Sequence, residues 1–157
     1  MRESAETSID PESGERLEKI LIELPSDHWS GKGGERVWAK PLGDGRYEIR
    51  NTPWYAYDIS WGDVVRCEGM SPADLPIVAE VVRSHGHLTA RIFFEEIEGA
   101  KRERILDEIN KRGATYENAD DTMYALDLEP NVNSQSLLDY LAVEEEAGHL
   151  VWESGWS

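Results

Sequence analysis

Two amphipathic helices, each set between apolar segments, dominate the second half of this 157-residue chain. Residues 101–112 carry aliphatic side chains on one helical stripe and end at Gly113, a residue typical of a helix C-terminus. A second helix is predicted from Asn133, a favourable N-cap, to Gly148. Strands are predicted around these helices at 88–95, 115–117, 122–128 and 150–153. The resulting β-α-β-β-α-β order is that of a ferredoxin-like unit, an antiparallel sheet with two helices on one face.

Short strands separated by turns fill the first half of the chain. Residues 46–50 alternate polar and apolar side chains, with the period of two that is typical of a half-buried strand. Further strands are predicted at 19–24, 37–40, 54–57, 64–68 and 77–82. We therefore expect an α+β fold. Residues 16–87 form a small, bent, barrel-like β-unit packed on a ferredoxin-like unit of residues 88–157, and the two can share one compact domain.

Acidic residues outnumber basic ones by 32 to 16, and the net charge is −16. Most of the excess lies at the two ends of the chain, in residues 1–15 and 101–157. Residues 1–15 contain almost no apolar side chains, so we expect a disordered acidic leader there. An acidic surface repels nucleic acid and anionic membranes and attracts a basic protein. The alternative is that the charge serves solubility alone.

The single cysteine, Cys67, excludes an internal disulfide and a cysteine-based zinc cluster. No apolar run is long enough to span a bilayer, and the first residues lack the apolar core of a secretory signal. These features indicate a cytoplasmic protein. Cys67 lies within the predicted strand 64–68, where a lone cysteine usually packs as a small hydrophobe.

His85 and His87 are the only closely spaced histidines and the first candidates for metal ligands. Residues two apart on an extended segment face the same way, so both rings could reach one zinc ion. A third ligand would have to come from His28, His149, Cys67 or a carboxylate. Two ligands do not make a site, so we expect no metal and no other cofactor. The sequence also lacks a Gly-x-Ser-x-Gly elbow and a phosphate-binding loop, and we assign no catalytic residue.

Acidic pairs and aromatic residues are the candidates for partner binding. Exposed tryptophans often anchor protein interfaces, whereas surrounding charges steer the encounter. The candidate anchors are Trp54 and Trp61, and the candidate steering residues are Asp120, Asp121, Glu144, Glu145 and Glu146.

Four motifs between residues 37 and 87 resemble a known bacterial family. They are VWAKPLGDGRY at 37–47, NTPWYA at 51–56, GDVV at 62–65 and SHGH at 84–87. Together they are similar to the bacterial domain-of-unknown-function family 4265, over about residues 17–155. The motif positions that carry the resemblance are Trp38, Pro41, Asn51, Pro53, Gly62, Asp63, Ser84, Gly86 and His87. The resemblance implies a soluble, stand-alone bacterial protein and no assigned reaction.

Residues 88–157 are also similar, in element order and acidity, to the type B regulator of ribonuclease E activity, which inhibits its ribonuclease by binding it. The resemblance favours an inhibitor. We therefore expect a non-enzymatic, acidic, immunity-type or inhibitor protein that neutralises a basic partner such as a nuclease toxin. The alternatives are a regulatory or small-ligand-sensing module, and a zinc-dependent hydrolase built on His85 and His87.

Overall fold

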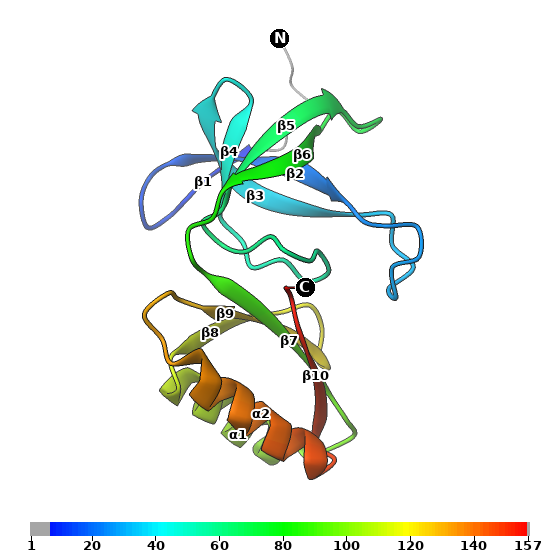
Figure 1. Cartoon of the computed structure of the whole chain (residues 1–157), viewed down its shortest axis with the longest axis vertical. Helices are drawn as coiled ribbons and strands as arrows, with labels where there is room; N and C mark the ends of the chain where they lie inside the picture. The colour runs from blue at the N-terminus through cyan, green and yellow to red at the C-terminus, as the bar shows by residue number, and fades with distance from the viewer. Residues whose placement is uncertain (1–6, 157) are drawn as a thin grey trace.

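A computed structural model describes residues 7–156 as two β-sheets, one of them covered by two helices (Figure 1). The first sheet holds β1 (Thr7–Ile9), β2 (Arg16–Glu23), β3 (Gly34–Gly43), β4 (Arg46–Ile49), β5 (Val64–Met70) and β6 (Pro76–Arg83). The second part holds β7 (Leu88–Phe94), α1 (Gly99–Lys111), β8 (Ala114–Asn118), β9 (Met123–Leu128), α2 (Ser134–Glu146) and β10 (Leu150–Ser154). The predicted α+β class is confirmed. We call β1–β6 with their loops the first unit, and β7–β10 with the helices the second unit.

The strands of the first unit close into a ring. Neighbouring strands from β1 to β6 pair in chain order, and β2 also pairs with β6, in parallel, at Leu21 and Ile77. Ile20, Val37 and Ile49 point inward and are almost inaccessible to solvent. The apolar alternation along these strands therefore fills the inside of the ring, as expected of strands with one buried face.

The second unit is an antiparallel sheet with the order β10-β7-β9-β8 and both helices on one face. Ile92 and Leu126 of the sheet pack in one cluster with Ile109 of α1 and Leu141 of α2. Asn133 accepts a hydrogen bond from the backbone N–H of Ser136, 3.1 Å away, and so caps α2 as predicted. Within residues 7–156, no helix is long and apolar enough to cross a membrane.

The opposite face of this sheet is also buried, although no helix covers it. Thr89 and Arg91 of β7 and Ala125 of β9 point to this side and are at most 1% exposed. Residues of the first unit cover them: Ser60 Oγ lies 2.9 Å from Thr89 Oγ1, and the Trp29 ring packs edge-on against Phe93. The helices therefore lie on the far side of the second sheet from the first unit (Figure 1). We call the two sides of the second sheet the helix face and the loop face.

Two segments differ from the sequence-based predictions. Residues 7–15 of the expected disordered leader are structured, because β1 pairs with β2 and Glu15 forms ion pairs with Lys40 and Arg50. Residues 1–6 of the leader lie outside the described residues. Residues 54–57 are not a strand but part of an irregular loop that joins β4 to β5. The backbone N–H groups of residues 54–56 bond to a side chain rather than to another strand.

Candidate functional site

The β4–β5 loop, residues 50–63, lies between the two units, and a buried carboxylate of the first unit holds it. Glu35 of β3 is 6% exposed, and its two oxygens accept three backbone N–H groups. The donors are Trp54 at 2.5 Å and Tyr55 and Ala56 at 3.0 Å each. Because hydrogen bonds to a charged acceptor are stronger than neutral ones, a single side chain fixes the path of three successive residues.

A buried guanidinium of the second unit holds the same loop from the other side. Arg91 of β7 is inaccessible to solvent and donates hydrogen bonds to the carbonyl oxygens of Pro53 and Ala56. Its charge faces Glu153 of β10 at 3.5 Å and the ring of Tyr57 at 5.2 Å. Burial lowers the pKa of the Arg91 guanidinium, and the nearby carboxylate of Glu153 opposes that change. Glu35 and Arg91 therefore clamp the loop between the units.

The beginning of the loop is tied to both units by polar side chains. Asn51 Oδ1 accepts the backbone N–H of Trp38 at 2.6 Å, and Glu117 of β8 accepts the backbone N–H of Thr52 at 2.7 Å. The family-motif residues Asn51 and Pro53 thus act through this loop. Their role is to position it, since the Asn51 side chain and the Pro53 carbonyl are both engaged in hydrogen bonds within the chain.

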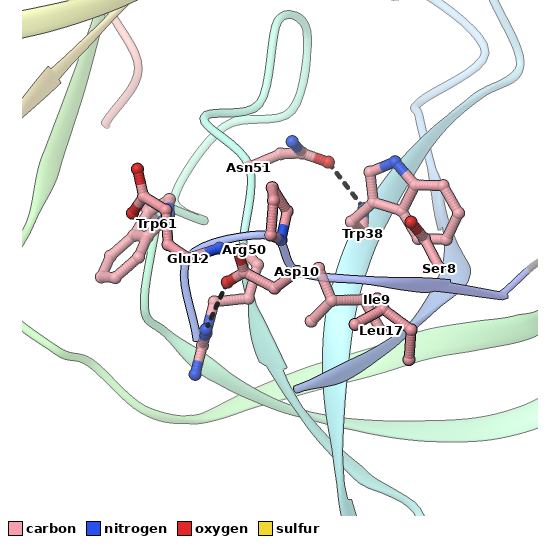
Figure 2. Close-up of a pocket in the computed structure, with 10 residues that line it drawn as sticks. Ser8, Ile9, Asp10, Glu12, Leu17, Trp38, Arg50, Asn51 and Trp61 are labelled. Carbon is pink, nitrogen blue, oxygen red and sulfur yellow. Dashed lines mark hydrogen bonds and ion pairs between the residues drawn. The ribbon is translucent and has the colours of Figure 1, made fainter. Parts of the chain in front are cut away.

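Three hollows lie around residues 50–52 and share lining residues, and we call the three together the groove. Their volumes are about 350, 160 and 330 Å³. The first and second share Trp38 as a wall, the first and third share Trp61, and the second and third share Glu117. Figure 2 shows the first hollow, between the turn after β1 and the two tryptophans. Trp38, Trp54 and Trp61 are all partly exposed, so the groove offers aromatic surface to a ligand.

Arg50 lies between the first and third hollows, but carboxylates surround it. Its guanidinium contacts Glu48 at 2.7 Å, Glu15 at 3.4 Å and Asp10 at 3.7 Å. Burial alone lowers the pKa of Arg50, but its hydrogen bonds and ion pairs with Glu48 and Glu15 outweigh burial and raise it. The charge of Arg50 is therefore already balanced within the chain, and the side chain does not make this groove a site for anions.

The two histidines considered as metal ligands pack at the junction of the units. Their rings stack 5.5 Å apart, and Trp61 lies 5.0 Å from the His87 ring. His87 Nδ1 is 2.8 Å from Asp127 Oδ1, and burial raises the pKa of Asp127 although His87 opposes the change. In the described part of the chain, no three His, Cys, Asp or Glu side chains are grouped to hold a metal ion.

The other candidate ligands lie elsewhere. His28 bonds to Ser30 and to the Tyr55 carbonyl, and His149 contacts Glu144 at 2.6 Å. Burial raises the pKa of the Cys67 thiol to about 12, so the thiol stays protonated and is a poor nucleophile at neutral pH.

The remaining family-motif residues lie in turns and at a strand register shift, outside the walls of the groove. Asp63 accepts the backbone N–H groups of Ser60 and His85, and the Ser84 hydroxyl accepts that of Gly86. Gly62 has a φ of +86°, and a Cβ there would lie 2.9 Å from the His85 ring. Pro41 lies on β3 where the register with β4 shifts. These motif residues therefore have structural roles, in turns and close packing, rather than a chemical role.

The acidic candidates lie at one end of the second unit, and three of them hold turns. Asp120 accepts the backbone N–H groups of Thr122 and Met123, and these bonds lower its pKa. Glu144 contacts His149, and Glu145 accepts the backbone N–H of Trp152 at the outer edge of β10. Asp121 and Glu146 are exposed. The structure therefore brings these acidic residues to one end of the sheet and places Trp54 and Trp61 on the groove.

Sequence reasoning missed the two residues that hold the loop, Glu35 and Arg91. A signal existed for Arg91, because it interrupts the otherwise apolar strand Leu88–Phe94. A charged residue at such a position has to find partners when the strand is buried. For Glu35, which precedes Val37 at the start of a predicted strand, the sequence contains no comparable signal.

Comparisons with known proteins agree with the motifs. A solved structure of a hypothetical protein from Neisseria gonorrhoeae has a similar fold, with a TM-score of 0.76 over 88% of this chain and 93% of that chain. The two sequences are 16% identical, so the likeness concerns the fold alone. The comparison with curated proteins gives no match. A family model, described as a domain of unknown function (DUF4265), matches residues 35–152, which is most of the chain. This protein therefore belongs to the DUF4265 family.

Proposed function

We propose that this protein is an acidic protein-binding module of the immunity or inhibitor type, which neutralises a basic partner such as a nuclease toxin. One observation carries the proposal: exposed carboxylates converge at one end of the second unit. At the end of β7, the Phe94 N–H bonds to the Thr122 carbonyl and the Glu95 N–H bonds to the His149 carbonyl. These bonds bring the β8–β9 turn and the α2–β10 turn together.

Besides Asp120 and Glu145, which accept backbone N–H groups, the exposed carboxylates at this end are those of Glu95, Glu96, Asp121 and Glu146. We call them the acidic end. They belong to a chain with a net charge of −16, so the field of the whole molecule adds to theirs. Charges of this kind increase the rate of encounter with a basic protein rather than the strength of the final contact.

Three finer features belong to the same proposal. The order β10-β7-β9-β8 supports a ferredoxin-like second unit, and the β2–β6 pairing supports a barrel-like first unit. The likeness of residues 88–157 to an inhibitor of a ribonuclease favours inhibition over catalysis. A single cysteine suits a cytoplasmic location.

The test uses charge reversal that leaves the turns intact. Basic proteins captured from a bacterial lysate at low salt are purified, and their association with this chain is followed by surface plasmon resonance at increasing salt. Asp121→Lys with Glu146→Lys is expected to lower the association rate several-fold and leave dissociation nearly unchanged. Glu23→Lys with Asp27→Lys, both exposed on the first unit, is the matched control. If the affinity for the captured protein does not change with salt concentration or with either pair of substitutions, the proposal is wrong.

A second candidate is a regulatory module that senses a small ligand. The observation in its favour is the 160 Å³ hollow between Trp38 and Trp54, which is of the size that holds a single small ring. A thermal-shift screen of small aromatic acids and amides tests it, with saturable stabilisation as the expected result. A zinc-dependent hydrolase receives the least support, because no third His, Cys, Asp or Glu ligand is grouped with His85 and His87 among the described residues.

A further inference from the structure

The groove around residues 50–52 differs from the acidic end in what it can offer a partner. The acidic end presents exposed carboxylates on turns, which act over a distance. The groove presents partly exposed tryptophans at the junction of the units, where a side chain can be enclosed. Enclosed aromatic contacts slow the dissociation of a complex, because they are desolvated when the complex forms.

We infer that this groove grips an extended, basic segment of the partner, an inference that rests on the proposed function. The three hollows meet at shared walls of Trp38, Trp61 and Glu117. Neighbouring side chains of a single extended segment can therefore occupy adjacent hollows. Trp61 separates the first hollow from the third, so it would contact such a segment on both sides.

Charge determines the kind of segment that fits. The walls of the groove contain six carboxylates, from Asp10, Glu12, Glu35, Glu117, Asp127 and Glu129, and three basic side chains, from Lys19, Arg36 and Arg50. Four of the carboxylates are engaged within the chain: Asp10 by Arg50, Glu35 and Glu117 by backbone N–H groups, and Asp127 by His87.

The basic side chains have partners already. Arg50 is surrounded by carboxylates, the Lys19 ammonium lies 4.8 Å over the Trp38 ring, and Arg36 also takes part in an interaction within the chain. The other two carboxylates, Glu12 and Glu129, are exposed, Glu12 on the first hollow and Glu129 on the third. An arriving lysine or arginine therefore finds carboxylates and a tryptophan ring together, a combination that binds cations by ion pairing and by cation–π contact.

The experiment uses a labelled peptide of alternating arginine and proline residues, which is extended before it binds. Fluorescence anisotropy gives its affinity at low salt, and a peptide of alternating glutamate and proline is the charge-reversed probe. The full chain is expected to bind the first peptide and not the second. Glu12→Lys with Glu129→Lys is expected to weaken binding by about tenfold or more, since both charges lie on the groove.

The control changes the net charge equally at another place. Asp121→Lys with Glu146→Lys is expected to alter the peptide affinity by less than about threefold, because these residues lie outside the groove. Trp61→Leu is expected to speed dissociation by about tenfold, and far-ultraviolet circular dichroism checks that the variant is folded. Thr115→Arg, at an exposed position on the wall of the third hollow, gives a second block of the groove that removes no buried group.

Two results would overturn the inference. In the first, the groove pair and the acidic-end pair weaken peptide binding equally, so that binding follows net charge alone. In the second, the parent chain does not bind the basic peptide, or Thr115→Arg and Trp61→Leu bind it as the parent does. Either result leaves the proposed function standing if the basic protein partner still associates in a salt-dependent manner. If the association with the basic protein partner does not depend on salt, the proposed function itself is contradicted.

Discussion

The two faces of the second sheet are buried by different kinds of contact. On the helix face, Ile92 and Leu126 pack against aliphatic side chains of α1 and α2. On the loop face, Thr89, Arg91 and Asp127 are also buried, but each makes hydrogen bonds or an ion pair. Apolar packing depends on area and shape, whereas hydrogen bonds depend on direction. The helix face therefore contributes stability, and the loop face fixes where the β4–β5 loop and its groove lie.

The largest effect is expected from a cavity on the helix face. Leu126→Ala removes a fully buried side chain from the central part of the sheet and should lower the free energy of unfolding by about 3 kcal/mol. Urea denaturation measures it. Leu42→Ala, at a leucine that is 44% exposed, is the control and should cost less than about 0.5 kcal/mol. Equal losses in the two variants would show that the helix face is not the main source of stability.

A smaller but more local effect is expected from the carboxylate that holds the loop. Glu35→Gln keeps the size of the side chain, removes its charge and leaves one oxygen to accept three N–H groups. The expected cost is about 2 kcal/mol, because buried donors lose a charged acceptor. Hydrogen exchange should quicken at Trp54, Tyr55 and Ala56 and stay unchanged in α1 and α2. Glu23→Gln, an exposed position on β2, is the control. Faster exchange throughout the helices would contradict the separation of the two faces.

A third effect follows from the backbone at the end of the loop. Gly62→Ala places a Cβ at a φ of +86° and 2.9 Å from the His85 ring, so it should cost about 1 kcal/mol. Gly33 has an ordinary φ and open space around it, and Gly33→Ala should be neutral or slightly stabilising. Thermal unfolding of both variants makes the comparison. If Gly62→Ala leaves the thermal stability unchanged, the His85 ring can move away from the added Cβ without cost.

The smallest effect concerns Asp127, whose pKa is raised by burial. A carboxyl group with a raised pKa in the folded state contributes stability below its ordinary pKa and loses it as the pH rises through the folded value. Asp127→Asn keeps an oxygen that can accept from His87 and does not titrate. The stability of the parent relative to this variant is therefore expected to fall as the pH rises above the ordinary carboxyl pKa of about 4. Urea denaturation at several pH values tests the sign, and a rise instead of a fall would contradict it.

The helix face could be predicted from the sequence, and the loop face could not. The stripes of residues 101–112 and 133–148 repeat with the helical period, so their buried sides follow from local spacing. The contacts of Glu35 with Trp54 and of Arg91 with Pro53 join residues 19 and 38 positions apart, and no local pattern encodes them. For the same reason the aromatic run at 54–57 resembles a strand in sequence and folds as a loop.

The candidate site was predicted in part. Trp54 and Trp61 were identified as anchors and lie on the groove, because aromatic residues in a polar, glycine-containing segment tend to remain partly exposed. Glu144 and Glu145, which we predict to steer a partner, also contact His149 and the backbone N–H of Trp152. A carboxylate near a turn can bond to backbone groups that only the folded chain brings close. Its sequence position therefore does not reveal whether it is free.

The contact between Glu35 and the β4–β5 loop also bears on the order in which the chain assembles during synthesis. Every strand of the closed ring, and the carboxylate that shapes the loop, has been made by residue 83. Arg91 leaves the ribosome afterwards, followed by the rest of the second unit. Because domains tend to fold from the N-terminus as they are made, the ring can present a loop already held by Glu35 to the arriving sheet, and Arg91 then holds its other side. The loop face would then be covered from the moment it forms, which limits the time during which a nascent, unpaired sheet can aggregate.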